Sequence, residues 1–145
     1  MSLFSLLSVS ASGMAVQRKR AELLVENLAN SETTRTPEGG PYKRKDAIFQ
    51  SDPQVSPFSS VFQTALSGDV SGVRVAEVQE DTREPDMRYL PGHPDANASG
   101  YVAFPRINPA EDMTDLVNTS RSYQGNVAAM TAVKDMIHRS LDILR

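Results

Sequence analysis

The stretch MTDLVNTSRSYQGNVAAMTAVKDMIHRSLDIL, residues 113–144, repeats apolar side chains at alternating spacings of three and four residues. A similar stretch, LFSLLSVSASGMAVQRKRAELLVENL, occupies residues 3–28. A sustained 3.5-residue period is typical of helices that supercoil around one another. The sequence therefore predicts a long helix at each end, the two forming an antiparallel coiled coil.

Each predicted seam contains polar positions, which would fix register and partner at some cost in stability. In the N-terminal helix the seam positions are Leu3, Leu7, Ser10, Met14, Gln17, Ala21, Leu24 and Leu28. In the C-terminal helix they are Met113, Leu116, Ser120, Tyr123, Val127, Met130, Lys134, Ile137, Leu141 and Leu144. Two amphipathic helices of a small bundle would explain the same pattern, because apolar stripes are common.

Local signals place the ends of both helices. Asn108 is a good N-cap and Pro109 suits the first helical position. Gly125 is a weak point that would allow a close helix approach. The N-terminal helix should end near Asn30, because residues 31–41 are rich in Pro and Gly.

Helices over residues 3–30 and 108–144 would be about 42 and 55 Å long. Since a compact domain of this length has a radius of gyration of about 15 Å, the helices should pair or project.

The middle of the chain reads as a small β-rich unit. Short strands are predicted at residues 47–49, 72–78 and 101–104, with a loop over 81–100. Phe58, Val61 and Phe62 form an apolar cluster of uncertain type. The expected fold is mainly α with a β-rich insert. Its units are a helix at 1–31, a loop and β-rich domain at 32–107, and a helix at 108–145.

The composition offers little for catalysis. The chain has no Cys, its two His lack a second ligand at metal spacing, and no phosphate-binding glycine loop or nucleophile motif occurs. No cofactor and no enzymatic activity are expected. A net charge of −3 gives no support to nucleic-acid binding. No segment is long and apolar enough for membrane insertion, and the N-terminus lacks the basic start of a cleaved signal peptide.

Charge is distributed unevenly along the chain. Residues 1–45 hold seven basic and four acidic side chains, whereas residues 46–95 hold three basic and nine acidic ones. A positive and an acidic section in one chain would suit head-to-tail packing of similar subunits. Ordinary surface solvation explains the same distribution equally well.

Several stretches of the chain carry recognisable motifs. Two are near the N-terminus: the stretch from Ser12-Gly13-Met14 through Asn27-Leu28-Ala29-Asn30, and the run from Arg35 to Lys45. Further motifs lie at residues 91–96, 100–102 and 120–127, where Gly125 replaces an expected Ala. Together these motifs resemble bacterial flagellar basal-body rod proteins, and within them the proximal-rod type. The resemblance covers nearly the whole chain except residues 50–85.

The resemblance implies a structural subunit that polymerises helically into the periplasm-spanning rod and transmits torque. It implies export by the flagellar type III apparatus without a cleaved signal. The implied partners are other rod proteins, further copies of the chain, the inner-membrane ring with its rod adaptor, and the export apparatus. A soluble coiled-coil adaptor or an export-linked binding module remains as the alternative.

Nine residues are expected to carry helix packing and assembly. Asn27 and Asn30 should end the N-terminal helix and bond to neighbouring backbone, with ordinary solvation of a helix end as the alternative. The full set is Leu24, Asn27, Leu28, Asn30, Leu116, Tyr123, Val127, Ile137 and Leu141.

Overall fold

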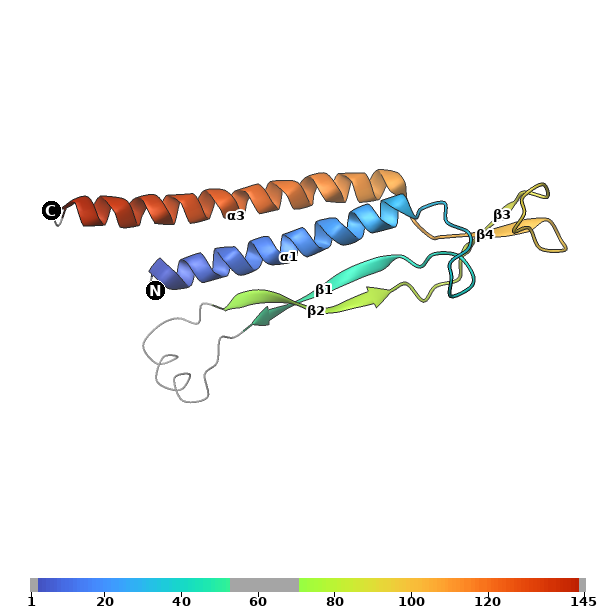
Figure 1. The fold of residues 1–145 in the computed structure, drawn as a ribbon, viewed down its shortest axis with the longest axis horizontal. Helices are drawn as coiled ribbons and strands as arrows, with labels where there is room; N and C mark the ends of the chain where they lie inside the picture. The colour runs from blue at the N-terminus through green and yellow to red at the C-terminus, as the bar shows by residue number, and fades with distance from the viewer. Residues whose placement is uncertain (1–2, 53–70, 144–145) are drawn as a thin grey trace.

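The computed structural model describes residues 3–52 and 71–143. Within these ranges the fold is mixed α and β. The elements are α1 (Leu3–Ala29), β1 (Lys45–Asp52), β2 (Gly72–Glu80), β3 (Asp86–Tyr89), β4 (Tyr101–Phe104) and α3 (Pro109–Ile143). Figure 1 shows an elongated molecule in which α1 and α3 run side by side and antiparallel. The helix ends nearest the chain termini lie toward one pole, and the β3–β4 hairpin forms the other.

Helix α1 lies between α3 and the β1–β2 hairpin (Figure 1), so it buries side chains on two sides. Val16, Leu23 and Leu24 are each only 4% exposed. The other buried apolar side chains lie in the segments around β1 and β4 and along α3. They are Tyr42, Val102, Phe104 and Ile107, with Val133 further along α3.

The Ser12-Gly13 pair explains how α1 fits between its two neighbours. The Ser12 hydroxyl accepts a hydrogen bond of 3.1 Å from the Val73 amide of β2 and donates one to the Val9 carbonyl. A Cβ on Gly13 would lie 3.1 Å from the Asn126 side chain of α3, a tight contact. The absence of a side chain at Gly13 therefore lets α3 approach closely.

The predicted helix ends are confirmed. The Asn108 side-chain oxygen accepts a hydrogen bond of 3.2 Å from the Ala110 amide, and α3 begins at Pro109. Helix α1 ends at Ala29, one residue before the predicted Asn30. The close approach expected at Gly125 is wrong, because nothing lies within 4 Å of the space that a Cβ would fill there.

The β unit contains two separate antiparallel pairs, β1 with β2 and β3 with β4. A register shift at Ile48/Phe49 interrupts the first pair. The three predicted strands are confirmed as β1, β2 and β4. The expected loop over residues 81–100 is wrong in part, since Asp86–Tyr89 forms β3 against β4. Pro85 before this segment and Pro91-Gly92 after it are typical of a loop. The strand is defined only by its pairing with β4. The predicted Phe58, Val61 and Phe62 cluster lies outside the described residues.

Candidate assembly surface

Helix α3 buries a row of mostly polar side chains rather than its most apolar row. Asp112, Thr119 and Val133 are 1%, 2% and 7% exposed, and Asn126, one heptad from both neighbours in this row, is half-buried against Gly13. Leu116, Met130 and Ile137 are also half-buried. One of the two predicted seam rows of α3 therefore flanks the buried row. It consists of residues 116, 123, 130 and 137, of which only Tyr123 is exposed.

The other predicted row of α3 is exposed instead of facing α1, which corrects the expected seam. Met113 is 54% exposed, Val127 40% and Leu141 58%, and Ser120 and Lys134 are also exposed. We call these five residues the exposed row. Apolar side chains that recur along a helix and remain in contact with water form a surface suited to another protein.

The predicted residues of α1 lie at its inner side and its C-terminal end. Leu24 is buried and Leu28 is half-buried. Asn30 donates from Nδ2 to the Glu26 carbonyl at 2.9 Å, and its Oδ1 accepts from the Thr33 hydroxyl at 3.2 Å. These bonds satisfy backbone and side-chain groups where the helix stops.

Asn27 is fully buried and joins α1 to the start of β1. Its Nδ2 donates to the Lys45 carbonyl at 2.9 Å, and its Oδ1 accepts from the Lys45 amide at 2.9 Å. The Tyr42 hydroxyl donates to the same Oδ1 at 3.0 Å. The amide side chain thereby pairs with Lys45 as a neighbouring strand would, so it fixes the angle between α1 and the β1–β2 hairpin.

A buried charge lies at the base of α3. The Asp112 carboxylate is fully buried, and Arg44 Nη2 lies 3.0 Å from its Oδ1. The contact is a close charge pair without hydrogen-bond geometry, because neither Asp112 oxygen has a hydrogen-bond partner. Burial raises the pKa of the Asp112 carboxyl, and the Arg44 charge opposes that rise. Gln17 and Thr119 also each bury an oxygen without a partner, so the α1–α3 contact contains uncompensated polar groups.

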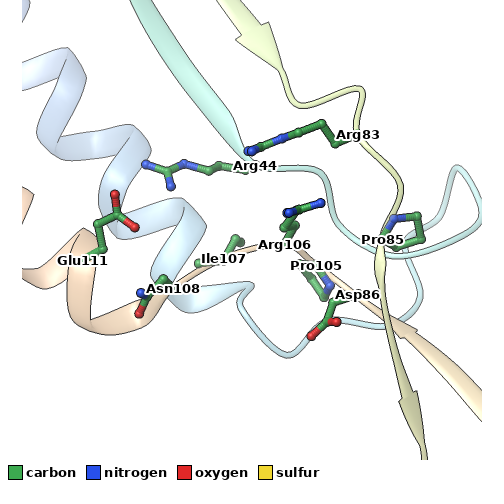
Figure 2. Close-up of a pocket in the computed structure, with 9 residues that line it drawn as sticks. All are labelled: Arg44, Arg83, Pro85, Asp86, Pro105, Arg106, Ile107, Asn108 and Glu111. Carbon is green, nitrogen blue, oxygen red and sulfur yellow. The ribbon is translucent and has the colours of Figure 1, made fainter.

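A pocket of about 500 Å³ opens beside Arg44 of this pair (Figure 2). Three arginines and two carboxylates line it, together with prolines and the start of α3. Arg83 binds the Asp81 carboxylate, and Arg44 contacts Asp46 at 3.3 Å as well as Asp112. The lining charges are thus largely paired within the chain, and the pocket has no arrangement of nucleophile and base. Its lining residues are Arg44, Arg83, Pro85, Asp86, Pro105, Arg106, Ile107, Asn108 and Glu111.

Across residues 3–52 and 71–143, no three His, Asp or Glu side chains lie together in a way that could hold a metal ion. In the same residues, neither helix is long and apolar enough to cross a membrane.

The residues that sequence reasoning missed are the polar members of the buried row, Asp112, Thr119 and Asn126. Their seven-residue spacing was visible in the sequence, but polar side chains are poor signals of burial. Gly13 gave the clearest available hint, because a glycine inside a helix often marks a close approach.

Known proteins resemble this chain along its whole length. The family described as "Flagellar basal body rod FlgEFG protein C-terminal" matches residues 98–143, which include β4 and α3. Flagellar basal-body rod protein FlgC of Bacillus subtilis is 41% identical over 150 residues, covering 99% of each chain. The FlgC protein of Borreliella burgdorferi is 37% identical over 155 residues, covering 100% of this chain and 99% of that one.

The FlgC protein of Salmonella typhimurium is 33% identical over 143 residues, covering 99% of this chain and 98% of its own. Identity at this level over full-length chains extends the likeness well beyond the shared C-terminal segment. The long helices agree with a role in building a larger structure. The chain therefore belongs to the FlgC family of flagellar basal-body rod proteins, which are structural subunits and not enzymes.

Proposed function

We propose that this chain polymerises helically into the proximal flagellar rod by packing the exposed row of α3 against neighbouring subunits. The observation that carries the proposal is the exposure of Met113, Val127 and Leu141 while polar Asp112 and Thr119 are buried. Burying exposed apolar area contributes about 25 cal/mol per Å², so this row would gain stability from a second helix. The coiled-coil character predicted for the helices would then be completed between subunits.

The neighbours in this proposal are the other rod proteins and further copies of the chain, with the inner-membrane ring and its rod adaptor at the base. Export through the flagellar type III apparatus would deliver the chain to the periplasm. Many close-packed helix contacts in a wall of subunits would resist torsion, because protein interiors have low compressibility. Leu24, Leu28, Leu116 and Ile137 would support this wall from the side where α1 and α3 meet, and Tyr123 would contribute an exposed side chain to it. Asn27 and Asn30 would hold the end of α1 in place.

The test is Val127→Asp, with Ala132→Asp as a matched control on another exposed face of α3. Each variant replaces the native chain in its bacterium. We expect Val127→Asp to be expressed normally, to keep its helical content, and to be missing from purified basal bodies by mass spectrometry. Cells carrying it should not swim, whereas the Ala132→Asp cells should.

Normal swimming with Val127→Asp would contradict the proposed surface. Native chain found only in the cytoplasm would favour the alternative, a soluble coiled-coil adaptor or export-linked binding module. A monomer that is rigidly ordered to both ends would favour the same alternative.

A further inference from the structure

The β3–β4 hairpin carries a second exposed apolar surface, separate from the exposed row of α3. Met87 is 50% exposed, Tyr89 64% and Tyr101 43%. We call these three residues the hairpin patch. Met87, Tyr89 and Tyr101 share one face of the hairpin, because they alternate with Arg88 and Val102 along the paired strands. The patch forms part of the pole opposite the chain termini (Figure 1).

The hairpin patch is held rigidly before any partner arrives. The rings of Tyr89 and Tyr101 meet edge to face with centroids 5.3 Å apart. Gly100 has a φ of 81°, and a Cβ there would lie 2.8 Å from the Tyr89 ring. On the opposite face, Val102 and Phe104 are buried. A small surface that is already ordered loses little entropy on binding.

The other pole has an incomplete helix pair. Gly13 lies against Asn126 and Arg20 pairs with Asp115, so the antiparallel register brings the first described turn of α1 opposite the residues just after Val133. The end of α3 extends beyond α1 in Figure 1. Ile137 is half-buried and Leu141 is 58% exposed, and they occupy one face at a spacing of four residues. We call Ile137 and Leu141 the helix-end patch.

We infer that the hairpin patch of one subunit docks on the C-terminal end of α3 of the next rod subunit along the axis. The inference rests on the proposed function and names what covers the last turns of the exposed row. The surfaces match in extent when Lys134 is included, since a four-residue strand spans about 13 Å and the eight residues from Lys134 to Leu141 span about 12 Å of helix. Lys134, on the Leu141 face, would lie over the two tyrosine rings.

The positions of the two patches explain why such a contact would propagate. Different surfaces at opposite poles of one elongated body make a head-to-tail interface, and repeated head-to-tail contacts that do not close form helical filaments. The family match over residues 98–143 includes α3 and β4, so it covers the helix-end patch and Tyr101, while Met87 and Tyr89 lie before it. Each copy of this chain carries both patches and would therefore bring both halves of the interface.

The test is a photocrosslinking amino acid, p-benzoylphenylalanine, at Tyr89 in cells that lack the native chain. Tyr123, an exposed tyrosine on the body of α3, serves as the matched position. After irradiation, basal bodies are purified and the crosslinked peptides are sequenced by mass spectrometry. We expect the Tyr89 crosslink to reach the C-terminal end of a rod subunit's last helix, and the Tyr123 crosslink to reach a different segment.

A Tyr89 crosslink to a ring protein or to another rod segment would overturn the inference. The absence of any Tyr89 crosslink, in basal bodies where Tyr123 does react, would overturn it too. Both outcomes leave the proposed function intact. If the chain is absent from basal bodies altogether, the proposed function fails first and the inference fails with it.

Gly100→Ala provides a second measurement with Gly92→Ala as its control. An added Cβ at Gly100 would push the Tyr89 ring, whereas nothing lies within 4 Å of the same position at Gly92. We expect Gly100→Ala to reduce the swimming-zone diameter in soft agar at least twofold and Gly92→Ala to leave it unchanged. Equal zones for the two variants would contradict a role for the hairpin patch.

Discussion

At the scale of single residues, this fold depends on polar side chains in buried places. Asn27 uses both ends of its amide to bind the Lys45 backbone, a role that no apolar residue could take. Asp112 buries a carboxylate in the first turn of α3, and the nearby charge of Arg44 offsets part of the cost of burying it. Asn27 thus stabilises the fold through satisfied hydrogen bonds, whereas Asp112 destabilises it through a buried carboxylate that has no hydrogen-bond partner.

Asn27→Ala should lower the free energy of unfolding by about 3 kcal/mol, because it leaves the Lys45 amide, the Lys45 carbonyl and the Tyr42 hydroxyl unpaired. Urea unfolding followed by circular dichroism measures this change. Asn30→Ala should cost about 1 kcal/mol, since that side chain is only partly buried. Equal losses for the two variants would contradict the role given to the Asn27 amide.

Asp112→Asn should raise stability at neutral pH and remove part of its pH dependence. Burial raises the pKa of the folded-state carboxyl above the ordinary value of 3.8, so the folded chain binds its proton more tightly than the unfolded chain. The free energy of unfolding of the native chain should therefore fall as the pH rises from the ordinary pKa of 3.8 through the raised pKa of the folded state. In the variant this fall is absent, and Arg44 keeps its contact with Asp46.

Unfolding measured at a series of pH values checks this expectation. The gain from Asp112→Asn should be largest at neutral pH and should vanish below about pH 4, where the carboxyl is protonated in both states. Asp115→Asn is the control, since Asp115 is partly exposed and pairs with Arg20. A loss of stability at neutral pH in Asp112→Asn would mean that the Arg44 attraction outweighs the cost of burial.

At the scale of elements, both helices and three of the four strands could be predicted from the sequence. Helix period and capping are local properties, so α1 and α3 were visible without the fold. Which face of α3 meets α1 is a tertiary property, and one of the two predicted seam rows is exposed instead. The contact instead follows steric fit at Gly13 and Asn126. Strand β3 was missed for a related reason, because it is defined by pairing with β4.

Thr119→Val should strengthen the helix pair by about 1 kcal/mol, because it removes a buried hydroxyl that has no hydrogen-bond partner. Thr131→Val is the matched control on the same helix, since its exposed hydroxyl binds the Val127 carbonyl. Thermal unfolding of the two variants should separate them, with a higher midpoint for Thr119→Val alone. A lower midpoint for Thr119→Val would show that the hydroxyl is needed where it lies.

At the scale of the whole molecule, the elongated shape leaves one end of α3 with fewer partners than its middle. Amides in residues 137–143 should exchange with solvent faster than those in residues 112–133, because fewer packed side chains hold that end closed. Hydrogen exchange with mass spectrometry on the free chain measures both ranges. Addition of assembled rod should slow exchange at the helix end, and equal protection in the free chain would contradict this description.

The family could be predicted from sequence motifs, but the faces that the fold leaves exposed could not. Asn27, Asn30 and Leu24 belong to motifs that the resemblance covers, and the fold then supplied their contacts. The hairpin patch had no such signal. Its residues lie on two strands whose pairing brings Tyr89 beside Tyr101, and the sequence between them reads as a loop.

The antiparallel helix pair also has a consequence for the order in which the chain folds. Arg20 and Asp115, which pair across the two helices, are 95 residues apart in the sequence. Whenever the chain emerges N-terminus first, α1 is complete long before α3 exists to cover it. Closing so long a loop carries an entropic cost before any contact forms. The pair therefore cannot form until α3, in the last 37 residues of the chain (109–145), has emerged.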